Sequence, residues 1–482
     1  MMEQADDWCW YFTAPWEPVP IRRGDALGFR AGADYFADIL APGLSNATVD
    51  ARWISLLSWC LKWSDLAWRK AGNGDPISRE EQSARYKWLR PLELLWVARA
   101  LESGQSTGWL PGLRSVEPWR KEGCRIPAGE GEFRFGMTDK QFSRYRQTGA
   151  YGAYRVLFRT VEGLTKGDGW TPGAIAEQLA KLVNDSLASD NPATDARLTE
   201  KDFEKTTRWS LWKNQEARYW ADPANGRWKN WRENLESGFL PTPRDAVNRL
   251  KEGSLLAKVL FGAGAAGFMR RATAEVLASA KADSHAGLVD ALASSDTLAK
   301  MLSTPGALAP LPAFTRFADA AMYAMRSLWH EMKDEKTPAI GKVADRLQKG
   351  LESAHDAGIE WLKVSVGIRD AFRHGAVVTQ LAQAMRDART PLDQLCALMA
   401  HHQAHGGGLR WFREQDGKIV PLAPYRGVTR SDYRFRLYPL SRLAAQCGVA
   451  RMDNVFDALG RNGFDDFDDV DEETSDEQGD AQ

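Results

Sequence analysis

The chain has 482 residues, of which 44% are hydrophobic, and it balances 63 Lys and Arg against 64 Asp and Glu. This composition is that of a globular protein and excludes a collagen, a coiled-coil rod and a chain disordered throughout. The net charge of −1 also excludes a uniformly basic nucleic-acid coat, while about 150 residues per domain predicts about three domains.

Tryptophan is unusually abundant, with 20 Trp against 19 Phe and 11 Tyr, and 17 of the 20 lie in residues 1–231. A Trp-heavy helical core is the simpler interpretation, and a stacking surface for bases or carbohydrate is the alternative. The five Cys are odd in number and lack CxxC spacing, which favours neither a disulfide framework nor a zinc knuckle. With no signal-peptide pattern and no apolar run long enough to cross a bilayer, we expect a cytoplasmic protein.

The hydrophobic periodicity predicts a mainly α-helical, multi-domain protein. We expect residues 1–137 to form a Trp-rich helical N-terminal domain. Its predicted helices cover residues 25–40, 48–70 and 78–102, and a loop region with one hairpin follows over 103–137.

Residues 138–240 form a second predicted domain, which is helical and rich in basic and aromatic residues. Thr138 and Gln141 have the spacing of a capping box, which predicts a helix that continues to about Leu164. Thr171–Pro172 then opens a helix that ends near Ala188.

Residues 241–406 are predicted to be a helical bundle. Apolar residues over 314–332 recur at steps of three and four, which predicts one buried stripe on a long helix. These residues are Phe314, Phe317, Ala318, Ala321, Met322, Met325, Leu328, Trp329 and Met332.

Residues 407–464 are predicted to form a small basic α+β module, because the hydrophobic period changes to two after three consecutive glycines. We expect a β-hairpin around Asp416–Gly417, a third strand over 433–437 and a short helix from Pro439. A helix followed by a basic hairpin resembles the end of a winged-helix unit. Residues 465–482 are expected to be a disordered acidic tail, since residues 465–480 hold ten Asp or Glu and no Lys or Arg.

Two stretches, 140–166 and 409–442, each carry a net charge of +5 with interleaved aromatic residues. Guanidinium groups bind phosphate through two hydrogen bonds and stack on bases, so this composition favours nucleic acid. An acidic partner protein and a merely solvated face are the alternatives. The predicted contact residues are Arg144, Arg146, Arg155, Arg159, Arg410, Arg413, Arg430, Arg434 and Arg436.

The remaining motifs point only weakly to enzymatic chemistry. Residues 262–267 fit GxGxxG, but both flanks are predicted helices, so we interpret them as a close turn between helices rather than a dinucleotide site. His401 and His405 share a helix face and could hold a metal, yet no Cys, Asp or Glu completes a set, and cations at a helix end are also favourable. We therefore predict no catalytic residue, no metal and no cofactor, and retain an enzyme with a metal near His401 and His405 as an alternative.

The segment from Leu27 to Trp59 includes Leu27–Arg30, Leu40–Thr48 and Ala51–Trp53. This segment resembles uncharacterised bacterial proteins encoded near antiviral (phage) defence genes. The resemblance implies a bacterial, cytoplasmic component of a multi-protein defence system beside helicases or nucleases. Our leading expectation is a non-catalytic component that binds nucleic acid, DNA ahead of RNA, or a partner nuclease or helicase. A scaffold that docks other subunits is the further alternative.

Overall fold

The computed structural model describes residues 25–103, 112–129, 132–188, 197–200, 246–334, 337–372, 374–405, 411–422 and 433–459. These residues are mainly helical with a small β-hairpin near the C-terminus, which confirms the predicted fold class. The chain divides into two compact units. Unit 1 takes the described residues from Arg52 to Glu252, and unit 2 takes those up to Ala51 and from Gly253 onwards. The predicted boundaries after residues 137 and 406 lie inside these units.

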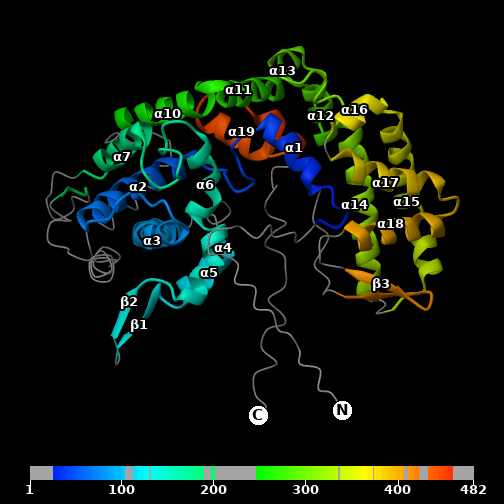
Figure 1. Cartoon of the computed structure of the whole chain (residues 1–482), viewed down its shortest axis with the longest axis horizontal. Coiled ribbons are helices and arrows are strands. Elements are labelled where there is room, and N and C mark those ends of the chain that lie inside the picture. The colour runs from blue at the N-terminus through cyan, green and yellow to red at the C-terminus, as the bar shows by residue number, and fades with distance from the viewer. Residues whose placement is uncertain are drawn as a thin grey trace, which may run out of the picture. The chain divides into compact units, whose positions relative to one another are not determined.

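The described residues of unit 1 form helices and one short antiparallel hairpin (Figure 1). Its elements are α2 (Ala51–Lys70, of which all but Ala51 belong to this unit), α3 (Arg79–Ser103), α4 (Leu113–Lys121), β1 (Arg125–Gly129), β2 (Glu132–Phe135), α5 (Asp139–Thr148), α6 (Ala150–Thr160) and α7 (Ala174–Ser186). The helix α10 (Ala246–Phe261) contains the division after Glu252.

The described tryptophans of unit 1 mostly build its core. Trp59 and Trp96 are fully buried and meet edge to face, with ring centroids 5.8 Å apart. The indole of Trp59 donates to Asn184 at 3.1 Å, and that of Trp119 donates to the Gly136 carbonyl at 2.7 Å. Burial with a partner for the N–H is the arrangement that a core indole requires. It supports the core interpretation for these residues.

A buried ion pair joins the two ends of unit 1. Arg52 at the start of α2 pairs with Glu252 in α10, and both side chains are almost completely buried. Removing one partner of such a pair leaves a buried charge without compensation, so the pair constrains these two helices strongly.

The predicted helix over 138–164 is two helices, and Gly149 is the reason. The ring of Tyr145 lies across this glycine, where an added Cβ would come within 2.2 Å of the Tyr145 ring. Gly149 is extended, ends α5 and starts α6. A residue with a side chain could not let Tyr145 fold back in this way.

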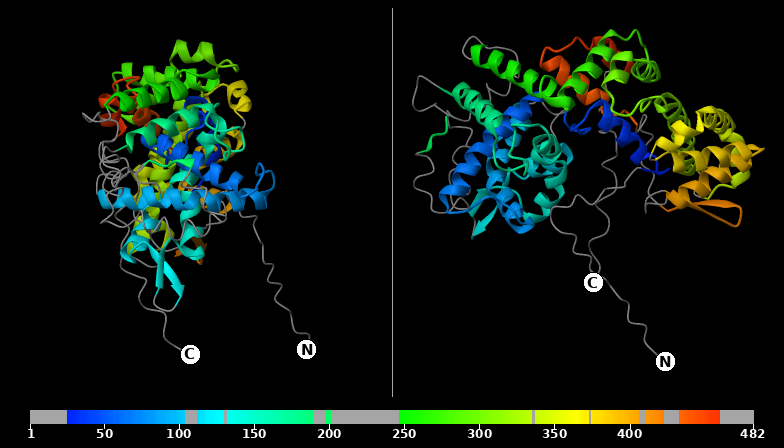
Figure 2. Two further views of the ribbon diagram at one scale, coloured as in Figure 1. Left: turned by 90° about the vertical axis from the view of Figure 1, so that its left-hand side faces the viewer. Right: turned by 45° about the horizontal axis from the view of Figure 1, so that its top comes forward.

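Unit 2 contains α1 (Arg30–Leu40) and the C-terminal half of the chain. Its other elements are α11 (Gly264–Ser279), α12 (His285–Ala293), α13 (Asp296–Met301), α14 (Leu311–Asp334), α15 (Ile340–Lys363), α16 (Val366–Ala371), α17 (Gly375–Asp387), α18 (Pro391–His405), β3 (Phe412–Gln415), β4 (Lys418–Pro421), α19 (Leu437–Gln446) and α20 (Asp453–Leu459). Helices α14, α15, α17 and α18 pack together as a bundle, which the right-hand view of Figure 2 shows in yellow-green to orange. Every residue of the stripe predicted on 314–332 is buried, which confirms that prediction.

The hairpin β3–β4 confirms the turn predicted at Asp416–Gly417, where both residues have positive φ. The strand β4 also forms a hydrogen bond with the segment that precedes α15, in which the Ile419 N–H donates to the Pro338 carbonyl at 2.9 Å. The third strand predicted over 433–437 is wrong. Phe435 and Arg436 are left-handed, with φ of 49° and 58°, and α19 begins at Leu437. The alternating apolar residues Tyr433, Phe435 and Leu437 are all buried, but they are buried by a turn and not by a strand.

The GxGxxG segment is a turn between two helices. Helix α10 ends at Phe261 and α11 begins at Gly264, so no strand precedes the glycines. Arg270 on α11 is buried and donates to the Leu260 carbonyl and to the Pro42 carbonyl, both at 2.6 Å. The segment is therefore a tight helix–helix connection, as the interpretation above expected.

Candidate nucleic-acid interface

The first basic stretch folds into α5 and α6, and its described arginines range from half-buried to exposed. The Thr138 side chain accepts a hydrogen bond from the Gln141 N–H, and the Gln141 side chain accepts one from the Thr138 N–H. The predicted capping box is therefore present. Helix α6 buries one face, and that face consists of Ala150, Tyr151, Ala153, Tyr154, Leu157 and Phe158. Arg155 is half-buried at the edge of this face, and Arg159, one turn further, is exposed.

The tyrosines that alternate with these arginines are core residues. Tyr145, Tyr151 and Tyr154 are fully buried. The Tyr151 ring lies 4.9 Å from that of Trp170, and Tyr86 from α3 packs within 6 Å of both rings. These tyrosine rings are therefore part of the core and are not available to stack on bases.

Arg155 is the best-held member of the group. Its guanidinium donates to Gln82 at 3.3 Å and lies 5.3 Å from the centroid of the Trp170 ring, within cation–π range. Burial lowers the pKa of Arg155, and the positive charges of Arg159 and Arg146 lower it further, while Tyr151 acts in the opposite direction. The guanidinium groups of Arg159 and Arg146 are therefore each near enough to that of Arg155 to affect it.

The other predicted residues of this stretch differ in position. Arg146 on α5 is half-buried, and its charge also acts on the buried Tyr86. The side chain of Arg144 lies outside the described residues. We call Arg146, Arg155 and Arg159 the arginine cluster.

A buried carboxylate lies beneath the cluster. Glu93 of α3 accepts the Tyr145 hydroxyl at 2.6 Å and the Tyr151 N–H at 2.8 Å, and the Tyr145 hydroxyl in turn accepts the Ala150 N–H at 3.1 Å. Glu93 and the Tyr145 hydroxyl thus satisfy the first two N–H groups of α6, at the end of the helix that favours negative charge. Burial raises the pKa of Glu93, and the hydrogen bonds from Tyr145 and Tyr151 oppose that rise.

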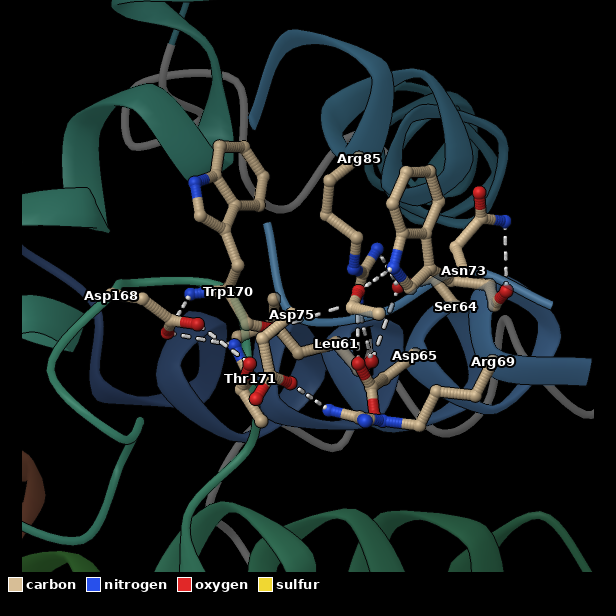
Figure 3. A network of polar contacts seen from close by, with 12 residues as sticks. Leu61, Ser64, Asp65, Arg69, Asn73, Asp75, Arg85, Asp168, Trp170 and Thr171 are labelled. Carbon is tan, nitrogen blue, oxygen red and sulfur yellow. Dashed lines mark hydrogen bonds and ion pairs between the residues drawn. The ribbon is translucent and has the colours of Figure 1, made fainter. Parts of the chain in front are cut away.

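A second buried group, Arg85, fixes the turn that follows α6 (Figure 3). It donates to Ser64 at 2.9 Å, to the Leu61 carbonyl at 3.2 Å and to the Trp170 carbonyl at 3.5 Å. Burial lowers its pKa to about 10, and the nearby Asp65 carboxylate acts in the opposite direction. Since Trp170 is the ring beneath Arg155, this contact ties α2 and α3 to the support of the arginine cluster.

In the second basic stretch, the structure describes residues 411–422 and 433–442. Arg410 and Arg430 lie outside the described residues, and Arg434 is half-buried. Arg413 is exposed on β3 and donates to Gln415 at 3.1 Å. The interleaved aromatic residues Trp411, Tyr433 and Tyr438 are buried, so they too are core.

Arg436 in particular is engaged by carboxylates of its own unit. It forms ion pairs with Asp38 and, at 3.4 Å, with Asp34, both on α1. Its side chain is 16% exposed. These contacts hold the start of α19 to α1 and give Arg436 a structural role.

The three histidines at the end of α18 also have structural contacts. The His401 Nε2 lies 2.9 Å from the Leu27 carbonyl, and the His402 Nδ1 lies 2.7 Å from that of Ala26. The Trp411 N–H donates to His402 Nε2 at 3.0 Å, so both His402 nitrogens are satisfied by the backbone. Burial lowers the pKa of His401 to about 4. In the described part of the chain, no group of three or more His, Cys, Asp or Glu side chains could hold a metal ion.

Sequence reasoning missed the residues that hold the cluster in place. Gln82, Arg85 and Glu93 come from α3, far from residues 140–166 in the sequence, and Trp170 lies just beyond them. A buried Arg or Glu in a predicted helix gives no signal of its own. Only Glu93 could have been suspected, because it interrupts an otherwise apolar run, Leu92 to Val97.

No helix in the described ranges has the length and apolarity to cross a bilayer. Comparisons with protein-family models, with curated proteins and with solved structures find no match to this chain.

Proposed function

We propose that this protein is a non-catalytic, DNA-binding component of a larger assembly and that the arginine cluster of unit 1 contacts the phosphate backbone. The observation that carries the proposal is the placement of Arg155 and Arg159 one turn apart on α6, with the Arg155 guanidinium 5.3 Å from the centroid of the Trp170 ring and Arg159 exposed. Like charges held together in this way favour a polyanion, because each phosphate contact releases counterions and relieves the repulsion.

The type of residue supports the same conclusion. A guanidinium presents a rigid fork that matches phosphate with two hydrogen bonds, and it loses less freedom on binding when it is already stacked. Arg155 is stacked over Trp170, and Arg159 lies one turn away on the exposed side of α6. Residues i and i+4 of a helix are neighbours on its surface, so the two can engage adjacent groups of one strand.

The assembly that we infer is a bacterial antiviral-defence system, with a nuclease or helicase as partner. This part of the proposal rests on the resemblance of residues 27–59. Several residues of that segment have structural roles: Phe29 and Leu40 are core residues of unit 2, while Arg52, Trp53 and Trp59 are buried in unit 1. Identifying the proteins that copurify from the native cell tests it, and recovery of the chain alone contradicts it.

The DNA-binding proposal is tested by fluorescence polarisation with a labelled 20-base-pair duplex over a series of salt concentrations. We expect the wild-type affinity to fall linearly with the logarithm of salt. The double variant Arg155→Ala/Arg159→Ala should lower the slope by about two, since each phosphate contact contributes about 0.9. Lys181→Ala, which removes an exposed charge on α7 of the same unit, is the control and should leave the slope unchanged.

Two outcomes overturn the proposal: no salt-dependent binding by the wild type, or equal slopes for the wild type and the double variant. An RNA duplex of the same sequence is assayed in parallel. Tighter binding of the RNA duplex at the same salt concentration would identify RNA, and not DNA, as the ligand.

A further inference from the structure

The turn between α6 and α7 touches both arginines of α6. An added Cβ at Gly169 would lie 2.7 Å from Cγ of Arg159, so the stem of this arginine lies directly against the glycine. The next residue, Trp170, provides the ring under the Arg155 guanidinium. Two consecutive residues of one turn therefore support the two arginines.

The turn is held by its own polar side chains. Asp168 accepts the Trp170 N–H at 2.7 Å, the Thr171 N–H at 2.9 Å and the Thr171 hydroxyl at 2.6 Å. Thr165 donates to the Phe158 carbonyl at 2.7 Å and accepts the Gly169 N–H at 3.3 Å. Asx-type bonds of this kind fix a turn without regular secondary structure.

The buried Arg85 also contacts this turn, because it donates to the Trp170 carbonyl at 3.5 Å (Figure 3). Positions 167 and 169 both have positive φ, +92° and +78°, a conformation that favours glycine. At Gly167, however, an added Cβ would meet no atom within 4 Å. The turn therefore has open space around Gly167, whereas Gly169 lies against the side chain of Arg159.

We infer that Gly169 and Trp170 are the positioning residues of the DNA-contacting surface and hold Arg159 and Arg155 ready for two phosphodiester groups of one strand. This inference rests on the proposed function and names the residues that prepare its site. A long arginine that is already held loses less rotamer freedom on binding, so its support contributes to affinity without touching the ligand.

The test compares Gly169→Ala with Gly167→Ala. Both variants place alanine in a left-handed conformation and share that cost, so they are matched for backbone strain. Only alanine at 169 displaces the Arg159 stem. We expect Gly169→Ala to weaken duplex binding about tenfold and to lower the salt slope by about one, the loss of one phosphate contact. Gly167→Ala should stay within about twofold of the wild type, and thermal unfolding of both variants shows whether the fold is kept.

A second comparison does not depend on the glycines. Trp170→Phe keeps an aromatic ring in the core but presents a weaker face to the Arg155 guanidinium. Trp96→Phe makes the same change at a fully buried residue that lies against Trp59. We expect DNA binding to weaken about threefold in the first variant and to remain unchanged in the second.

The outcomes separate the two proposals. If Arg159→Ala weakens binding but neither Gly169→Ala nor Trp170→Phe differs from its control, the positioning inference is wrong and the proposed function stands. If Arg159→Ala and Arg155→Ala leave binding unchanged, the proposed function itself fails.

Discussion

The two basic stretches have the same net charge in sequence, but their described arginines have different surroundings in the structure. Residues 140–166 place Arg155 half-buried over the ring of Trp170, and Arg159 exposed one turn further along α6. In residues 409–442, Arg436 is neutralised by Asp34 and Asp38 of α1. The comparison teaches that net charge along a sequence marks a candidate surface, whereas the partners of each guanidinium decide whether it faces a ligand or holds the fold together.

The largest expected effect concerns the carboxylate beneath the first stretch. Glu93→Ala leaves the Tyr145 hydroxyl and the Tyr151 N–H buried without their acceptor, and we expect unit 1 to lose about 3 kcal/mol of unfolding free energy. Glu93→Gln keeps an oxygen in that place and should cost about 1 kcal/mol. Urea unfolding followed by tryptophan fluorescence measures both, and equal losses would show that Glu93 does not cap α6.

The next effect concerns the helix that leads into the second stretch. The pKa of His401 is about 4 in the folded protein and about 6.5 in the unfolded chain, so the folded protein contains the neutral imidazole. As the pH falls, His401 is therefore protonated in the unfolded chain before it is protonated in the folded protein. The contribution of His401 to the free energy of unfolding is fully present above about pH 6.5. It falls by up to about 3 kcal/mol as the pH decreases from about 6.5 to about 4.

The comparison of His401→Gln with His330→Gln isolates that contribution, since His330 is exposed on α14. We expect the wild type and His330→Gln to lose stability together as the pH falls from 7 to 5, and His401→Gln to lose less. Parallel curves for all three proteins would contradict the buried, neutral state of His401.

The smallest effect distinguishes the arginines themselves. Arg436→Ala removes two ion pairs at a mostly covered side chain and should lower the stability of unit 2 by about 1 kcal/mol, less at high salt. Arg159→Ala removes an exposed side chain and should leave thermal unfolding unchanged. If Arg159→Ala is destabilised and Arg436→Ala is not, then Arg159 has the structural role and Arg436 does not, which contradicts our assignment.

The sequence predicted those features that are set by local patterns. The stripe from Phe314 to Met332 followed from helical periodicity, and the hairpin followed from Asp416–Gly417, whose residues favour the left-handed turn it needs. The strand expected over 433–437 failed because alternate burial also arises in an irregular turn, where Phe435 and Arg436 are left-handed.

The candidate site was predictable only in part. Its arginines were visible as a basic run, but their supports were not, because Glu93 contacts residues more than 50 positions away and Arg85 meets Trp170 across 85 positions. The carboxylates that engage Arg436 lie about 400 positions earlier in the chain. Such pairings are created by the fold, and no local pattern announces them.

The most direct test of the account is the salt dependence of duplex DNA binding for two double variants measured side by side. We predict that Arg155→Ala/Arg159→Ala lowers the slope of log affinity against log salt by about two, and that Arg434→Ala/Arg436→Ala leaves it unchanged. An equal reduction in both variants, or a reduction in the second alone, would contradict the claim that unit 1 carries the DNA-contacting surface.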